Sequence, residues 1–182
     1  PEGLTADEAI EALAALDADG AMDYVSVVAG TSATLAGSDH IVPPSPIPNG
    51  YTAPLAARVR AAVRVPVMVA GRITQPQEAE AILAAGQADM CGMTRAMICD
   101  PSMPAKARQG ATDDIRACIA CNQACIGHFH RGLPISCIQY PESGRELALG
   151  TLPAAPRPRK VMVVGGGPGG MKAALTAAAR GH

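Results

Sequence analysis

The stretch Val65-Pro-Val-Met-Val-Ala-Gly-Arg72 indicates how the whole chain is organised. Its apolar residues form a short continuous run that stops at a glycine and an arginine, as expected for a strand in a parallel sheet with helices outside. A similar run precedes it at Tyr24–Val28, and another follows at Ala88–Gly92 and ends in Met93-Thr94-Arg95. The sequence therefore predicts three strands of one parallel sheet.

Helical patterns alternate with these strands. A capping box at Thr5 and Glu8 begins the first helix. A second helix is expected after the capping residue Thr52, and a third from about Gln75 to Ala85, whereas the proline-rich residues 30–50 are predicted to form a loop. The alternation predicts an α/β fold with helices outside a parallel sheet. Three such units do not close a barrel, but they would fit as the last three of the eight in a TIM (β/α)8 barrel.

Composition and charge exclude several classes of partner. Of the 182 residues, 48% are hydrophobic and 17% are charged, and the formal net charge is −1. So balanced a charge predicts no nucleic-acid or anionic-lipid partner. The sequence contains neither an apolar run long enough for a membrane span nor a signal pattern, so we expect a cytoplasmic protein that does not enter membranes.

Four of the six cysteines are close in sequence, at Cys118, Cys121, Cys125 and Cys137, with the spacing C-x2-C-x3-C-x11-C. Three thiolates within eight residues can hold three corners of a compact cluster, and a return loop can supply the fourth. Zinc ribbons favour two C-x2-C pairs, and only the first pair here fits. An iron–sulfur cluster is therefore favoured, while a zinc site and unligated core thiols remain the alternatives.

The other cysteines and two histidines have simpler interpretations. His128 and His130 lie in the return loop, either as substitute ligands or, as we expect, as exposed loop residues. Cys91 and Cys99 flank the end of the third predicted strand and are expected to be buried, inert thiols.

A glycine-rich turn lies near the C-terminal end of the sequence. After the proline-rich linker Leu152–Pro158, a strand is expected at Lys160–Val164, and Gly165, Gly167 and Gly170 then lead into an alanine-rich helix. This G-x-G-x-x-G pattern between a strand and a helix is typical of the phosphate-binding turn of a Rossmann-like domain.

The order of these motifs resembles a known family. The chain contains Gly71-Arg72-Ile73, then Met93-Thr94-Arg95 with Asp100-Pro101, then the cysteine motif, then Val164–Gly170. This series is similar to the iron–sulfur branch of the old yellow enzyme family of NADH:flavin oxidoreductases, which includes 2,4-dienoyl-CoA reductase and trimethylamine dehydrogenase. The chain would be a fragment of such an enzyme and inactive alone.

The resemblance implies a domain plan and a set of cofactors. Residues 1–110 would be the C-terminal portion of an FMN-binding barrel, 111–150 the [4Fe-4S] segment, 151–159 a linker and 160–182 the start of a domain that binds FAD or NAD(P). Electrons would pass from NAD(P)H through the C-terminal flavin and the cluster to FMN, and then as hydride to an unsaturated substrate such as an enoyl or dienoyl compound.

Site residues follow from the same resemblance and from barrel geometry. Phosphate often binds the loops after the last two strands of such barrels, so Gly71, Arg72, Thr94 and Arg95 are expected to bind the FMN phosphate. His40 is the candidate catalytic acid, against the alternative of a solvent-exposed loop residue. The second hypothesis is an amine or N-methyl dehydrogenase or demethylase, in which electrons would leave the substrate through the cluster. A third hypothesis is a non-catalytic zinc module. A small-molecule substrate is expected, and a homo-oligomer is possible.

Overall fold

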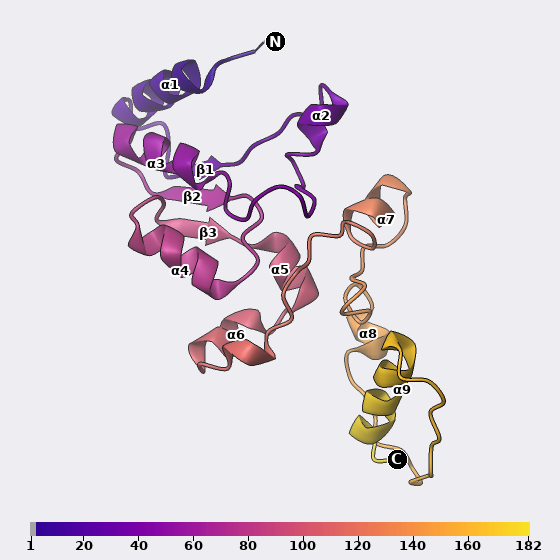
Figure 1. The fold of residues 1–182 in the computed structure, drawn as a ribbon. Coiled ribbons are helices and arrows are strands. Elements are labelled where there is room, and N and C mark those ends of the chain that lie inside the picture. Colours follow the sequence, from indigo (N-terminus) through magenta and orange to yellow (C-terminus); the bar gives the residue numbers. More distant parts are fainter. Residues whose placement is uncertain (1–2) are drawn as a thin grey trace. The chain divides into compact units, whose positions relative to one another are not determined.

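The computed structural model describes residues 3–182, which form two compact units. The first unit extends to Ser143, and the second comprises Gly144–His182 (Figure 1). The cysteine segment therefore belongs to the same compact unit as the predicted barrel strands.

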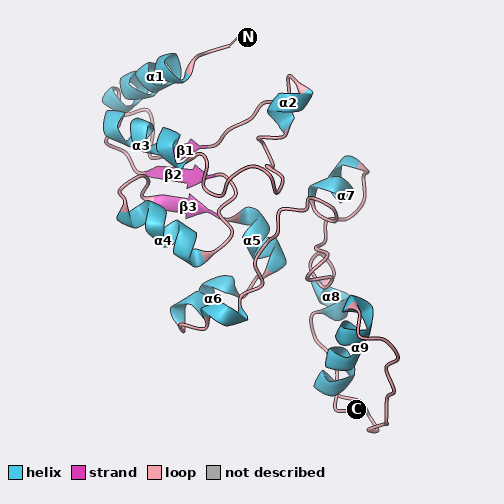
Figure 2. Ribbon diagram, viewed as in Figure 1, coloured by secondary structure: helices cyan, strands magenta, loops and turns pink. Residues whose placement is uncertain are grey.

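A three-stranded parallel sheet lies at the centre of the first unit (Figure 2). The strands β1 (Val25–Val27), β2 (Val67–Ala70) and β3 (Met90–Gly92) pair in the order β1-β2-β3. Val27, Val69 and Cys91 stand opposite one another across the sheet. The three predicted strands are confirmed, each shorter than its apolar run.

Helices connect and extend these strands. In the first unit they are α1 (Ala6–Ala18), α2 (Leu35–Ser38), α3 (Ala53–Ala62), α4 (Pro76–Ala84), α5 (Thr94–Cys99), α6 (Met103–Arg108), the 3-10 turn Thr112–Asp114 and α7 (Ile126–His130). The second unit contains α8 (Glu146–Leu149) and α9 (Pro168–Ala179). Because α3 joins β1 to β2 and α4 joins β2 to β3, the predicted α/β alternation is confirmed; the short α2 lies within the predicted loop.

One face of the sheet carries the core. Val67 and Val69 are fully buried and pack with Ala56 and Val59 of α3, while Ile82 of α4 joins the same cluster. The alanine on α3 lets the helix backbone approach the sheet closely, so a core with few aromatic residues can pack densely.

The helix termini show which local signals hold. The capping box on α1 is confirmed, because the Thr5 amide donates to Glu8 Oε2 at 2.7 Å and the Glu8 amide donates to Thr5 Oγ1 at 3.3 Å. Thr52 precedes α3 as predicted, but the prediction that its side chain caps the helix was wrong. Its hydroxyl is buried and donates instead to the Ala70 carbonyl at 3.1 Å, because a tertiary partner replaces the local one.

The predicted strand at Lys160–Val164 was wrong. Residues 160–164 are all described and have no regular structure, and the side chains of Met162 and Val164 are each 87% exposed. A strand needs a neighbouring strand for its backbone donors and acceptors, and the described part of the second unit contains none. The helix after the glycine-rich turn does form, as α9.

Candidate functional site

A pocket of about 240 Å³ opens where the three parallel strands end. Its lining includes His40 and the predicted phosphate-binding residues that follow β2 and β3. The latter are Gly71, Arg72, Thr94 and Arg95. Residues from three separate loops therefore meet at the carboxyl edge of the sheet, where α/β proteins commonly bind ligands.

The loop after β2 leaves no room for a side chain at Gly71. A Cβ atom there would lie 2.1 Å from Thr52 Oγ1, so the backbone of this strand end packs directly against the start of α3. The next residue, Arg72, has a positive φ of 54°. Its Nη1 group donates to the carbonyls of Ser45 and Ile47, whereas its buried Nε has no hydrogen-bond partner among the described residues.

Arg95 is half-buried and anchored on one nitrogen. Its Nη1 group donates to the Pro43 carbonyl and to Asn122 Oδ1, both at 2.8 Å. Because both bonds use Nη1, the Nε and Nη2 groups remain available to a phosphate within the described structure. Thr94, beside it, is exposed at the pocket edge.

His40 lies at the rim of this pocket. Its side chain is exposed, and its ring stands 5.6 Å from that of Tyr51, whose hydroxyl donates to the His40 carbonyl at 2.7 Å. Burial raises the pKa of Tyr51, although the Arg95 charge acts in the opposite direction. A histidine and a tyrosine therefore stand together at one side of the pocket.

The four predicted cysteine ligands line a second, smaller cavity. Arg95 lines this cavity as well as the first, so it forms part of the wall between them. The Ala120 amide donates to Cys118 Sγ at 3.4 Å. Burial raises the pKa of the Cys118 thiol, the neighbouring Cys125 and Cys137 add to the rise, and the Ala120 amide and the Arg95 charge counteract it.

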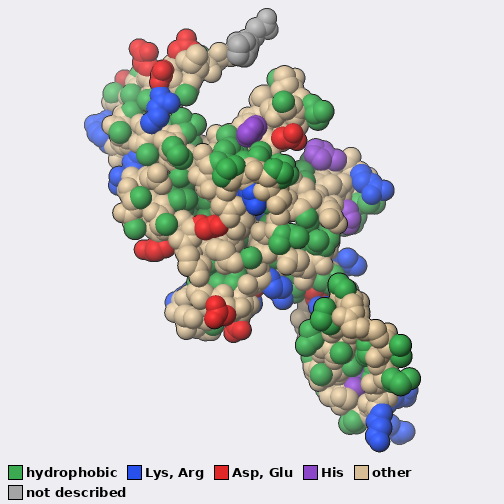
Figure 3. Space-filling view, in the orientation of Figure 1, with side chains coloured by type: hydrophobic (Ala, Val, Ile, Leu, Met, Phe, Trp, Pro, Cys, Tyr) green, Lys and Arg blue, Asp and Glu red, His purple; other side chains and the backbone are tan. Residues whose placement is uncertain are grey.

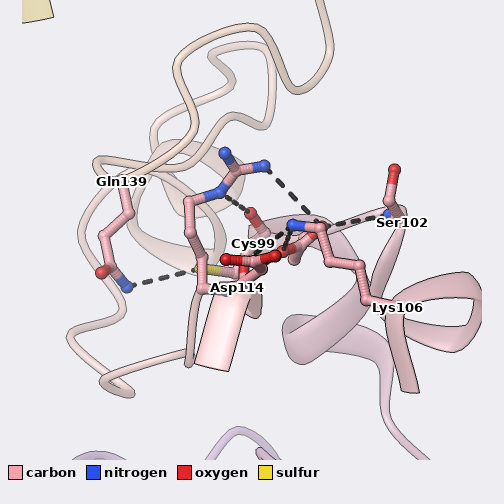
Figure 4. Close-up of polar contacts among 7 residues, drawn as sticks. Cys99, Ser102, Lys106, Asp114 and Gln139 are labelled. Atoms are coloured by element: carbon pink, nitrogen blue, oxygen red, sulfur yellow. Dashed lines mark hydrogen bonds and ion pairs between the residues drawn. The ribbon is translucent and has the colours of Figure 1, made fainter. Parts of the chain in front are cut away.

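Cys99 stands next to this group as a fifth thiol. It is 1% exposed, which confirms the predicted burial, and it accepts a hydrogen bond from Gln139 Nε2 at 3.4 Å (Figure 4). Burial, with a contribution from the neighbouring Cys137, raises the pKa of Cys99 to about 12. Cys91 on β3 is half-buried, so its predicted burial is only partial. The inertness of both thiols stays a prediction.

A buried acid, Asp100, joins α5 to the segment that leads into the cysteines. Its carboxylate is 0% exposed and accepts from Lys106 Nζ at 2.6 Å, from the Arg116 amide at 3.0 Å and from the Ser102 amide at 3.1 Å. Figure 4 shows the side chain of Lys106 and the backbone of Ser102 at this network. Arg116 lies only two residues before Cys118, so Asp100 fixes the start of the cysteine segment.

The two loop histidines differ from the prediction. Both belong to the short helix α7 instead of a loop, and His128 is half-buried with Nδ1 2.9 Å from the Pro134 carbonyl. His130 is exposed as predicted. The turn back toward Cys137 thus supplies a carbonyl that lies within hydrogen-bond distance of the His128 ring.

The backbone geometry of the glycine-rich turn in the second unit requires glycine at two positions. Gly165 has a φ of +106°, and a Cβ atom on Gly170 would lie 2.0 Å from the Gly165 carbonyl oxygen. Gly167 is the N-cap of α9, and a Cβ added there would meet no atom within 4 Å. The turn therefore folds tightly while its middle glycine stays open to a ligand.

On the face shown in Figure 3, basic and acidic side chains are interspersed over the unit that ends at Ser143. Within residues 3–182, none of the helices is long and apolar enough to cross a membrane. Nor do three or more Cys, His, Asp or Glu side chains of that range form a group that could hold a metal ion.

Comparison with known proteins shows the family to which this chain belongs. The model of the NADH:flavin oxidoreductase / NADH oxidase family matches residues 8–114, and this chain belongs to that family. The α/β fold is similar to that of 2-naphthoyl-CoA reductase, with a TM-score of 0.87 and 33% identity over 99% of this chain and 27% of that one.

Two curated relatives extend the comparison. The chain is 44% identical over 136 residues to a metal reductase of Desulforamulus reducens, covering 75% of this chain and 20% of the relative. It is 42% identical over 185 residues to an N,N-dimethylglycine/sarcosine dehydrogenase of Chromohalobacter salexigens, covering 100% of this chain and 26% of that protein. The chain thus spans a fifth to about a quarter of the length of these relatives.

Two polar residues at the site have contacts that the sequence did not predict, although Asp100 belongs to the motif series quoted above. Asn122 lies inside the cysteine motif, and its Nδ2 donates to the Val42 carbonyl 80 residues away. Asp100 follows α5, and its partners lie at most 16 residues away, at Arg116. The position of an asparagine between two cysteines was the one signal that could have drawn attention to Asn122.

Proposed function

We propose that this chain is part of a flavin- and iron–sulfur-dependent oxidoreductase that reduces an unsaturated small molecule with electrons from NAD(P)H. The observation that carries this proposal is the position of Arg95. It lines both the pocket that holds the predicted phosphate-binding residues and the cavity lined by the four cysteines. Two adjoining cofactor sites at the end of one sheet suit the transfer of electrons between them.

The residues of the larger pocket fit an FMN phosphate. Arg72 has a buried Nε that lacks a partner among the described residues, and Arg95 has donors beyond the anchored Nη1. Guanidinium groups match the oxygen geometry of phosphate, and the bare backbone at Gly71 allows a ligand to approach closely. The flavin, when bound, would supply hydride transfer, and the cluster would supply single electrons.

The cysteine cavity fits an iron–sulfur cluster by the chemistry of its donors. Four soft thiolates favour such a cluster. Zinc ribbons favour two C-x2-C pairs, and only Cys118 and Cys121 form such a pair. Thiols placed around a shared cavity support the cluster, with a [4Fe-4S] centre as the specific proposal, over the non-catalytic zinc module.

The glycine-rich turn supports a second nucleotide site. Gly165 and Gly170 close the turn and Gly167 leaves its centre open, as a pyrophosphate at a helix N-terminus requires. FAD or NAD(P) is the proposed ligand, and the proposed domain limits are residues 1–110, 111–150, 151–159 and 160–182. Cysteines that serve as cluster ligands or stay reduced suit the proposed cytoplasmic location, and the proposed assembly is a homo-oligomer.

The residues at the rim of the pocket support reduction as the direction of the reaction. We assign His40, beside Tyr51, as the proton donor to a reduced double bond, and its exposed ring can reach a substrate above the pocket. The second candidate is amine or N-methyl oxidation, which is favoured by the similarity to the N,N-dimethylglycine/sarcosine dehydrogenase over the whole chain. Reduction of an enoyl compound by NAD(P)H, set against oxidation of an N-methyl amine by the same preparation, separates them.

Replacing Arg95 with alanine tests the flavin site. Charge-assisted hydrogen bonds to phosphate contribute about 1.5–3 kcal/mol, so Arg95→Ala in the complete protein should weaken FMN binding roughly ten- to a hundredfold. Flavin fluorescence measures the affinity. Arg58→Ala, which removes an exposed arginine from α3, is the matched control and should bind FMN as the wild type does. An unchanged affinity in Arg95→Ala would contradict the phosphate site.

A further inference from the structure

Asn122 links three segments that are distant in the sequence. Its side-chain oxygen accepts from Arg95 Nη1 at 2.8 Å, and its side-chain nitrogen donates to the Val42 carbonyl at 2.8 Å. The same Arg95 nitrogen donates to the carbonyl of Pro43, the next residue, at 2.8 Å. The amide thus closes a small hydrogen-bonded ring between the loop after β1, the start of α5 and the cysteine motif.

The backbone at Asn122 is shaped for this position. Its φ is +57°, in the left-handed region that asparagine tolerates better than most residues. Its carbonyl accepts from the Gly127 amide at 2.8 Å, and a Cβ on Gly127 would come within 2.7 Å of that oxygen. The turn between Cys121 and Cys125 is therefore closed behind Asn122, which directs the amide side chain toward Arg95.

We propose that Asn122 is a positioning residue that couples the two cofactor sites: it holds the Arg95 guanidinium in place for the FMN phosphate, and the cysteine loop holds Asn122. This inference rests on the proposed function. Asn122 acts through Arg95, whose Nη1 group is fixed by the ring and whose Nε and Nη2 groups are left to bind the phosphate. Any ordering of the cysteine loop is then transmitted to the phosphate site through one amide.

Such a coupling has a reciprocal consequence. If the bound cluster orders the loop that carries Asn122, it strengthens FMN binding, and FMN binding stabilises the cluster by the same factor. The effect should be confined to the phosphate end of the flavin, because Arg95 is the residue that Asn122 holds. Riboflavin, which has the ring system of FMN without the phosphate, is therefore the discriminating probe.

The variant Asn122→Gly tests the proposal with little backbone cost, since glycine accepts the positive φ while both amide hydrogen bonds are lost. In the complete, flavin-depleted protein, FMN binding measured by flavin fluorescence should weaken about tenfold, with riboflavin binding unchanged. Asn49→Ala is the matched control: that amide bonds to Thr74 and Glu78 instead of to Arg95, so its loss should leave the Arg95 guanidinium in place and change neither affinity. Unchanged or tighter FMN binding in Asn122→Gly, or an equal loss for both flavins, would overturn the proposal.

Two further measurements separate this inference from the proposed function. In an Arg95→Ala background, Asn122→Gly should have no additional effect on FMN affinity, because both act through one side chain; additive losses would contradict the coupling. In the wild type, removal of the cluster by an iron chelator should weaken FMN binding and leave riboflavin binding unchanged. In Asn122→Gly, the chelator should cause no further loss of FMN affinity.

The two proposals can fail separately. If Arg95→Ala leaves the FMN affinity unchanged, the proposed flavin site is wrong. If Arg95→Ala weakens FMN binding but Asn122→Gly does not, only the coupling is wrong.

Discussion

Replacing Cys121 or Cys125 with serine in the complete protein is expected to remove iron and inorganic sulfide together. A serine hydroxyl is a harder and less acidic ligand than a thiol, so it binds cluster iron poorly. Both thiols line the cavity that also contains Cys118 and Cys137, and loss of one ligand opens a corner of the proposed cluster. We expect the iron content to fall to a small fraction of that of the wild type.

Iron and sulfide analysis, with the broad visible absorption of a cluster, measures this loss. Cys91→Ser is the matched control, because Cys91 is a half-buried thiol on β3 outside the cysteine cavity. It should retain the full iron content. Full iron stoichiometry in both Cys121→Ser and Cys125→Ser would show that these residues are not ligands, and a colourless wild type rich in zinc would favour the structural zinc module.

A second large effect is expected at Asp100. Removing one partner of a buried ion pair typically costs 3–5 kcal/mol, and Asp100→Asn should cost about 3 kcal/mol because Lys106 is a quarter exposed. The loss should loosen the Arg116 segment ahead of Cys118 as well as α6. Thermal unfolding of the complete protein, followed by cluster absorbance, should therefore begin several degrees lower.

The protonation of Asp100 supplies a further check on the same network. Burial alone would raise the pKa of Asp100, but the hydrogen bonds from Lys106 and the Arg116 amide outweigh it and hold the pKa below its ordinary value. The stabilisation is therefore complete above the unfolded pKa of about 3.9 and is lost as the pH falls through the lower folded value. The difference in the free energy of unfolding between the wild type and Asp100→Asn should therefore become smaller at acidic pH. Asp113→Asn, at an exposed acid nearby, should change stability little; an equal loss there would show that Asp100 has no special role.

The elements that the sequence predicts well are those determined by local pattern. The apolar runs around Val67 and Val69 gave the strands because burial of such residues is the main source of stability in a parallel sheet. The capping box of Thr5 and Glu8 closes within one helical turn, so its signal lies within four residues. The spacing of the cysteines predicted a shared ligand set, and all four line one cavity; their binding of a cluster stays a prediction.

The features that were missed depend on partners distant in sequence. Threonine is a common N-cap residue, but the hydroxyl of Thr52 donates to the Ala70 carbonyl instead of capping the helix. The apolar residues Val161–Val164 have a strand pattern without a strand to pair with in the described part of their unit. Asn122 bonds to a carbonyl 80 residues earlier, and local propensity contains no information about such a contact.

The tight packing at the end of β2 limits how this site can diverge among related sequences. Any side chain at position 71 would collide with the hydroxyl and methyl groups of Thr52, while that hydroxyl also binds the Ala70 carbonyl. Substitutions at positions 52 and 71 should therefore be epistatic: a larger residue at 71 would be tolerated only where 52 has become smaller. The two positions, 19 residues apart in the chain, should evolve as a covarying pair.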